Sequence, residues 1–257
     1  RAIPLLEQTL EDRVRTLGAD HPETLISRNN LALGFRSAGD LDRALPLFDE
    51  TLAAAEQILG TDHPLTLTAR NNLGTAYQGA GDLDRAIPLL EQTLEDRVRT
   101  LGADHPETLI SRNNLADGYQ GAGDLDRALP LFTTNVAAMV RVLGPDHPDA
   151  LVARHNLANA YLAAGDLRLA TPMFRDCLDA MVRVLGAENP LTLMARNNLA
   201  SAYWTAGRLD EATPLVEETL DIMTRLLGPD HPDSRLVATN LAALRRARNR
   251  KRPTSPA

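Results

Sequence analysis

Apolar residues recur along this chain with helical spacing, in short stretches that proline and glycine interrupt. Residues 22–38 and 41–59 show the pattern clearly, because the apolar positions of each stretch fall on one side of an α-helix. These positions are Leu25, Leu31, Ala32 and Phe35 in the first stretch, and Ala44, Phe48, Leu52 and Ala55 in the second. The pattern predicts two amphipathic helices joined by a short turn.

The ends of the predicted helices carry start and stop signals. Pro22 lies in an opening turn, where its missing N–H is harmless, and Asp20 or His21 can cap that helix. Gly39 ends the first helix, and Asp40 is a suitable N-cap for the second. The two helices therefore form one antiparallel pair.

This helix pair repeats along the sequence with a period of 42 residues. The turn glycines show it: Gly18, Gly60, Gly102, Gly144, Gly186 and Gly228. A fixed period of this length predicts an all-α fold, an α-solenoid of antiparallel helix pairs in which each repeat packs mainly on its neighbours. We expect the solenoid to span 1–248, with a half repeat at 1–17, five full repeats at about 22–227 and a single helix at about 232–246.

The two ends of the chain differ from a complete repeat. Residues 1–17 are identical to 85–101, which lie inside a second helix, so the chain begins in the middle of a repeat and is expected to be a fragment of a longer protein. Residues 249–257 are predicted to form a disordered basic tail at the natural C-terminus. Each end leaves an apolar stripe uncovered, which predicts weak end-to-end self-association.

Charge and hydropathy exclude several classes of partner. The net charge is −7, and without the six basic residues between Arg245 and Arg252 the body carries about −13. An acidic body argues against nucleic-acid binding along the repeats, since phosphate contacts need a basic stripe. No apolar run reaches 18 residues and no signal segment is present, so we expect no membrane contact and a cytoplasmic location.

Motifs for catalysis or metal binding are missing from the sequence. It contains no G-x-x-x-x-G-K-[ST], G-x-S-x-G or H-E-x-x-H. Five of six histidines occupy equivalent turns, about 10 Å apart in a helical solenoid, whereas metal ligands lie about 2 Å from one centre. Cys177 takes a slot that holds threonine in other copies, which favours a small packed side chain. We therefore predict no enzyme activity, no cofactor and no metal.

The repeat resembles the tetratricopeptide repeat of the 42-residue, kinesin-light-chain-like type. Matching residues are the His-Pro-x-Thr-Leu opening (21–25 and 63–67), the Asn-Leu core (30–31 and 72–73) and the Gly-Asp-Leu-Asp-x-Ala turn (39–44, 81–86 and 123–128). Asn189, Arg208 and Arg245 depart from the pattern. The resemblance implies a right-handed superhelix whose first helices line a concave groove for peptides or partner proteins. In bacteria, similar arrays often form the C-terminal part of signalling NTPases.

The stripe of each first helix that matches the family's groove-facing stripe supplies the candidate site. Its members are Asn29, Asn71, Asn113, His155 and Asn197 in one row, Thr75, Asp117, Asn159 and Ser201 in the next, and Arg36, Gln78, Gln120 and Trp204 in the last. Amide side chains both donate and accept, which suits gripping an extended peptide backbone, and the variable members would set specificity. The alternative is that these residues are simply solvated.

Two further rows of residues are expected to be architectural. Asn30 and its equivalents are predicted to be buried and to bond to the backbone of a neighbouring helix, so that replacing them lowers stability. The row before them, at Asn71 for example, is predicted to point away from the packed side, so that replacing it barely changes stability. Arg28, Arg70, Arg112, Arg154 and Arg196 should each meet a carboxylate or a helix end.

These observations predict a non-catalytic interaction module that binds a peptide or a partner protein in its concave groove. Two alternatives stay open. The array could be the C-terminal regulatory or sensor segment of a larger signalling NTPase, or it could be a structural scaffold that assembles through its ends.

Overall fold

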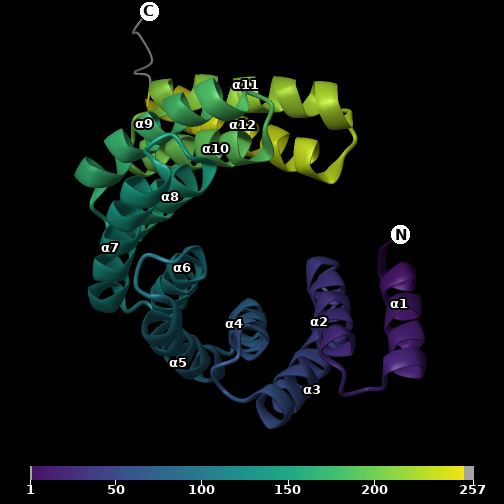
Figure 1. Cartoon of the computed structure of the whole chain (residues 1–257). Helices are drawn as coiled ribbons and strands as arrows, with labels where there is room; N and C mark the ends of the chain where they lie inside the picture. Colours follow the sequence, from purple (N-terminus) through teal and green to yellow (C-terminus); the bar gives the residue numbers. More distant parts are fainter. Residues whose placement is uncertain (1, 252–257) are drawn as a thin grey trace, which may run out of the picture. The chain divides into compact units, whose positions relative to one another are not determined.

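The computed structural model of the chain describes residues 2–251. Within them lie twelve helices and no strand (Figure 1). The first six are α1 (Ala2–Leu17), α2 (Pro22–Ser37), α3 (Leu41–Leu59), α4 (Pro64–Gly79), α5 (Leu83–Leu101) and α6 (Pro106–Gly121). The other six are α7 (Leu125–Leu143), α8 (Pro148–Ala163), α9 (Leu167–Leu185), α10 (Pro190–Thr205), α11 (Leu209–Leu227) and α12 (Pro232–Lys251). The predicted all-α helix pairs are confirmed, and no described helix is long and apolar enough to cross a membrane.

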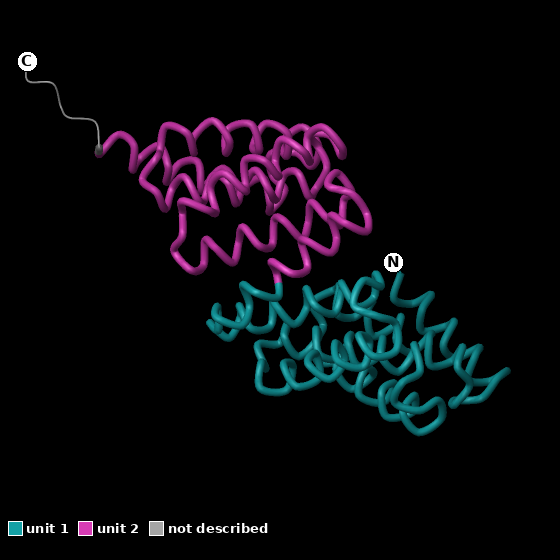
Figure 2. The backbone as a smooth tube through the Cα atoms, turned by 60° about the vertical axis from the view of Figure 1, so that its left-hand side comes forward, with its two compact units in different colours: residues 1–131 teal, residues 132–257 magenta. Residues whose placement is uncertain are grey.

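The chain forms two compact units, residues 1–131 and 132–257, whose boundary falls inside α7 (Figure 2). In the first unit, the five consecutive pairs from α1·α2 to α5·α6 pack together, and the first helices α2, α4 and α6 also touch in succession. In the second unit, α8 to α12 pack in the same consecutive way, and α8 touches α10. Each unit therefore repeats one packing step, as expected for a solenoid.

The predicted apolar stripes form the core of each unit. In the first unit, Leu31, Phe35 and Phe48 are buried together with Leu73 and Tyr77 of the next repeat. Burying a side chain of this size contributes roughly 1.5–3 kcal/mol. Because these contacts cross from one repeat to the next, no repeat could bury its apolar face alone.

The histidines of the repeat turns are N-caps of the first helices. His21 Nδ1 accepts a hydrogen bond from the backbone N–H of Glu23 at 3.2 Å, and His63 Nδ1 accepts one from Leu65 at 3.1 Å. In the fifth copy, Asn189 Oδ1 accepts from the N–H of Leu191 at 2.9 Å. The departure at Asn189 thus preserves the cap, since asparagine is a favoured N-cap residue.

Two substitutions at His63 distinguish the contribution of its capping hydrogen bond to stability from that of the rest of the side chain. His63→Ala should lower the free energy of unfolding by about 1 kcal/mol, the usual cost of losing a cap, whereas His63→Asn should retain it as Asn189 does. Urea denaturation at pH 7.5 measures both. Equal losses in the two variants would contradict the capping role.

The turn aspartates cap the second helices and hold an arginine over an aromatic ring. Asp40 Oδ1 accepts from the backbone N–H of Arg43 at 3.2 Å, and the Arg43 guanidinium lies 4.2 Å from the ring centroid of Phe35. In the fifth copy, Arg208 forms no cap but pairs with Glu211 at 2.8 Å and lies 4.6 Å from the Tyr203 ring. This departure reverses the charges of the pair and keeps the stacking.

The last helix is longer than the sequence pattern indicates. α12 continues to Lys251, whereas the expected helix ends at about 246. Its final turns are rich in arginine and alanine, which favour helix even without an apolar stripe. The rest of the expected basic tail, residues 252–257, lies outside the described residues.

Candidate functional site

Asparagine side chains of the first helices form hydrogen bonds between consecutive repeats. Asn72 Nδ2 on α4 donates to Asn29 Oδ1 on α2 at 3.1 Å. One repeat further on, Asn114 Nδ2 on α6 donates to Asn71 Oδ1 on α4 at 3.2 Å. The bonds recur in the same register, so the first unit contains a ladder of amides that runs across α2, α4 and α6.

This amide ladder corrects the roles expected for the two asparagine rows. Asn29 and Asn71 are buried, with exposed fractions of 5% and 6%, so the prediction that they point away from the packed side is wrong. Asn30 is exposed, while Asn72 and Asn114 are half-buried and bond to side chains rather than to a helix backbone. Consecutive residues lie about 100° apart around a helix, so both rows flank the seam between repeats.

The amide ladder leaves a regular set of polar atoms unbonded. Among the described residues, Nδ2 of Asn29 and Asn71 and Oδ1 of Asn72 and Asn114 have no protein partner. Each step of the ladder therefore offers one donor and one acceptor, and the inter-repeat bond fixes their positions. Neighbouring helices stand about 10 Å apart, a distance that about three residues of an extended chain span.

A buried arginine supports the ladder from behind. Ser111 Oγ donates to Asn71 Oδ1 at 3.3 Å and accepts from Arg97 at 2.8 Å. Arg97 is only 2% exposed and also donates to the Glu107 carbonyl at 2.9 Å. Arg13 makes the matching contact with Ser27 at 2.8 Å. Sequence analysis did not single out these arginines, although an arginine and a serine 14 residues apart recur in the duplicated block.

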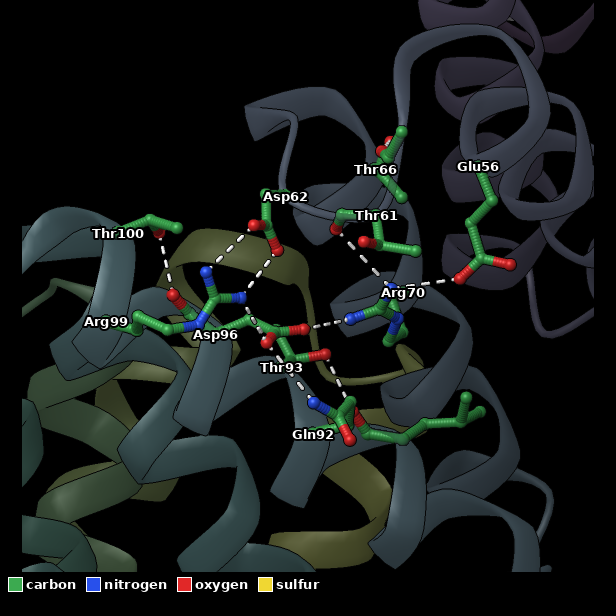
Figure 3. A network of polar contacts seen from close by, with 12 residues as sticks. Glu56, Thr61, Asp62, Thr66, Arg70, Gln92, Thr93, Asp96, Arg99 and Thr100 are labelled. Atoms are coloured by element: carbon green, nitrogen blue, oxygen red, sulfur yellow. Dashed lines mark hydrogen bonds and ion pairs between the residues drawn. The ribbon is translucent and has the colours of Figure 1, made fainter.

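The arginine row of the first helices meets carboxylates and helix ends, as predicted, in three copies. Arg70 pairs with Asp96 at 2.7 Å and with Glu56 at 2.9 Å (Figure 3). Arg112 donates to the Ala103 carbonyl at 3.1 Å, and Arg196 pairs with Glu218 at 3.0 Å. These arginines hold the helices together rather than face a ligand.

Asp96 is the centre of the network in Figure 3. It accepts hydrogen bonds from Arg70 at 2.7 Å, from Arg99 at 2.8 Å and from Gln92 at 3.2 Å. Burial alone would raise the pKa of Asp96, but these three hydrogen bonds outweigh burial and lower it. Arg99 also grips Asp62 with two bonds of 2.8 and 2.6 Å. The network links α4 and α5 to the turn before α4.

The remaining candidate residues of the first unit form pairs. Arg36 on α2 donates to Thr75 Oγ1 on α4 at 2.6 Å. Asn113 Nδ2 donates to Asp117 Oδ2 at 2.9 Å on α6. Burial raises the pKa of Asp117 to about 6, because the single bond from Asn113 offsets only part of the lost hydration. Two further candidates, Gln78 and Gln120, are half-buried.

In the second unit, one asparagine side chain contacts two candidate residues. Asn198 Nδ2 on α10 lies 2.9 Å from His155 Nε2 and donates to Asn159 Oδ1 at 3.1 Å, both on α8. His155 is fully buried, and its ring lies edge-on to Phe174 with centroids 5.2 Å apart. An amide N–H donating to Nε2 requires the neutral ring. Burial accordingly lowers the pKa of His155 to about 4.

This buried histidine predicts an acid-sensitive stability. Its folded-state pKa lies below the unfolded value of about 6.5, so its contribution is present above pH 6.5 and is lost as the pH falls toward 4. Between pH 7.5 and 5 the loss should be about 2 kcal/mol. His155→Asn, which restores the residue of the other copies, should remove that part of the pH dependence. Thermal unfolding at both pH values tests this, and identical pH profiles would contradict it.

The amide ladder does not continue from α10 to α12. Asn197 and Asn240 are both exposed, and no hydrogen bond joins them. Instead, a cavity of about 360 Å³ opens between these helices, and Asn197, Ser201, Trp204 and Asn240 line it. Three candidate residues therefore share one cavity.

A second cavity of about 410 Å³ adjoins the first, since Asn197 and Asn240 line both. Its other lining residues are mainly apolar, and Met194 and Leu236 are 39% and 60% exposed. Trp204 beside the first cavity is 41% exposed. The crease between α10 and α12 therefore combines free amides with apolar surface, which is the composition of many ligand sites.

The thiol of Cys177 is not activated. Cys177 is fully buried, and burial raises the pKa of its thiol to about 11, the opposite of an activated thiolate. Within residues 2–251, no three histidine, cysteine or acidic side chains come close enough to hold a metal.

Comparison with known proteins places the chain in a family. Tetratricopeptide-repeat models match residues 1–56, 30–97, 71–134 and 113–181, and another matches 192–233. The chain belongs to the tetratricopeptide repeat family. A search of curated protein sequences finds no significant match.

Solved structures narrow the type of tetratricopeptide repeat. A putative kinesin light chain from Podosopora anserina with nearly identical repeats is 31% identical, with 80% of this chain and 98% of that chain aligned and a TM-score of 0.67. BtubC (BKLC) from P. vanneervenii is 22% identical over 90% of this chain and 92% of its own, with a TM-score of 0.72. NprR in complex with its cognate peptide NprX is 16% identical over 99% and 69%, with a TM-score of 0.65. The repeats are thus kinesin-light-chain-like, as predicted.

Proposed function

We propose that this tetratricopeptide array is an interaction module that binds an extended peptide segment of a partner protein along its first helices. The observation that carries the proposal is the amide ladder, because each of its steps holds a free donor and a free acceptor at a fixed position. Such atoms match the N–H and C=O groups of a peptide backbone. NprR, a protein with the same fold, was crystallised in complex with its cognate peptide, which supports peptide binding.

In the second unit, the crease between α10 and α12 is a separate place where such a segment would bind. Its cavity of about 360 Å³ is large enough for one large apolar side chain, and Trp204 and Ala243 supply apolar contacts beside the amides of Asn197 and Asn240. A segment bound there carries a large apolar residue that enters this cavity, while its backbone bonds to the amides of Asn197 and Asn240.

Selection of peptides from a random dodecapeptide display library tests the proposal. Selected peptides that bind at this crease should quench or shift the fluorescence of Trp204, the only tryptophan of the chain. Asn197→Ala combined with Trp204→Ala should weaken binding at least tenfold and leave the melting temperature unchanged, since both side chains are exposed. Arg99→Gln, which alters the exposed pair with Asp62, is the matched control and should bind as the wild type does. Failure to enrich any peptide would overturn the proposal, and equal binding by the double variant would exclude the crease as a binding site.

A further inference from the structure

Two charged candidate residues on the first helices of the first unit lack a counter-ion in the described part of the chain. Arg36 on α2 and Asp117 on α6 are half-buried, and among the described residues neither has a partner of opposite charge. Several other buried charges of this unit are paired, as Arg70 is with Asp96 and Arg97 is with Glu107. Arg28 is half-buried and forms no ion pair within residues 2–251 either. A desolvated charge without a counter-ion is unfavourable, which makes such a group a candidate for binding one.

The surroundings of Arg36 leave most of its guanidinium free. Its one hydrogen bond goes to the neutral hydroxyl of Thr75 at 2.6 Å, and that bond fixes the side chain across the seam between α2 and α4. Burial lowers the pKa of Arg36, yet the group stays charged at any physiological pH. A held, charged and unpaired guanidinium is well suited to a carboxylate, which it can bind with two parallel hydrogen bonds.

Asp117 carries the opposite charge and likewise has no ion-pair partner among residues 2–251. Asn113, one turn earlier on the same helix, supplies its only hydrogen bond, at 2.9 Å. Gln78 lies in the same register to Asp117 as Arg36 does to Thr75, 39 residues earlier in each case, but Gln78 carries no charge. A basic side chain of a ligand would supply the counter-ion that Asp117 lacks within the described part of the protein.

We propose that the first unit selects a peptide segment with an acidic residue at Arg36 and a basic residue at Asp117, so that the charges fix the direction in which the segment lies. This inference rests on the proposed peptide binding and adds its charge pattern. Helices α2 and α6 are two repeats apart, or about 16–20 Å. An extended chain rises about 3.3 Å per residue, so the two charges of the ligand are separated by about five or six residues.

Peptide selection on charge variants tests the pattern. Random dodecapeptides enriched on the wild-type chain should carry an acidic and a basic residue at that spacing, always in the same order. Selection on Asp117→Asn should lose the basic residue and keep the acidic one, and Arg36→Gln should do the reverse. A synthetic peptide of the enriched sequence should bind Asp117→Asn at least tenfold more weakly in calorimetric titration.

A second variant keeps the Asp117 carboxylate but supplies it with a counter-ion from the protein itself. Gln78→Arg should place a guanidinium beside Asp117, in the register that Arg36 adopts beside Thr75. It should abolish the preference for a basic residue without lowering the melting temperature. Arg99→Gln again serves as the control.

The outcomes separate this inference from the function on which it rests. Enrichment of peptides with no charge pattern, or a pattern unchanged in Asp117→Asn and Gln78→Arg, would overturn the charge inference and leave peptide binding intact. Enrichment of no peptide at all would overturn both.

Discussion

Asp96→Ala is expected to destabilise the protein more than any other single substitution in the polar network of Figure 3. The change removes the hydrogen-bond acceptor of Arg70, Arg99 and Gln92. Arg70 is 5% exposed and would keep only its bond to Glu56 and a weak contact with a carbonyl. Removing one partner of a buried ion pair costs about 3–5 kcal/mol, and the remaining Glu56 contact places the loss near 3 kcal/mol.

The matched control for Asp96 is Asp62, which binds the same arginine from the solvent side. Arg99 bonds to both carboxylates, but the side chains of Arg99 and Asp62 are 54% and 51% exposed. Exposed pairs contribute little, so Asp62→Ala should unfold at nearly the wild-type denaturant concentration. Urea titration of both variants at pH 7 measures the difference. Similar midpoints for the two would show that burial does not decide the strength of this network.

Asp117→Asn is expected to have the opposite effect and to stabilise the protein at neutral pH. The folded-state pKa of Asp117, about 6, lies above the unfolded value of about 3.9. Stability from this group is therefore present below pH 4 and is lost as the pH rises through 6. After allowance for partial exposure, the asparagine variant should gain about 2 kcal/mol at pH 7.5 and almost nothing at pH 4.

Thermal unfolding of Asp117→Asn at these two pH values checks the gain. Asn113→Ala is a useful companion, since it removes the only hydrogen bond that favours the charged form and should lower stability at pH 7.5. If Asp117→Asn is more stable than the wild type but binds peptide poorly, Asp117 lowers stability and contributes to binding, as functional-site residues often do. An Asp117→Asn variant less stable than the wild type at pH 7.5 would contradict this account.

The helix pairs, their turns and the core could be predicted from the sequence, because each depends on local signals repeated every 42 residues. Leu31, Phe35 and Phe48 are buried where helical periodicity places them. The histidine caps could be narrowed only to Asp20 or His21, since both side chains can accept a backbone N–H. The structure selects the histidine because His21 has the extended backbone of an N-cap.

Whether the two asparagine rows face solvent or a neighbouring repeat could not be predicted in the same way. A polar stripe opposite an apolar one predicts solvent exposure, but in a solenoid the first helix also packs against the first helices of its neighbours. Asn29 and Asn71 are buried by this second contact, which no single helix reveals. The cavity beside Trp204 depends on the spacing of α10 and α12, which the sequence pattern does not determine.

The claim that free amides bind a peptide backbone is tested most directly by an N-methyl scan of a selected peptide. Methylating one backbone nitrogen removes an N–H donor and leaves the side chain in place. We expect sensitivity about every third residue, where Asn72 or Asn114 Oδ1 would accept that N–H, with a loss of roughly 2- to 12-fold per methylated site. Affinity that depends on side-chain identity alone, with no position sensitive to N-methylation, would contradict the account.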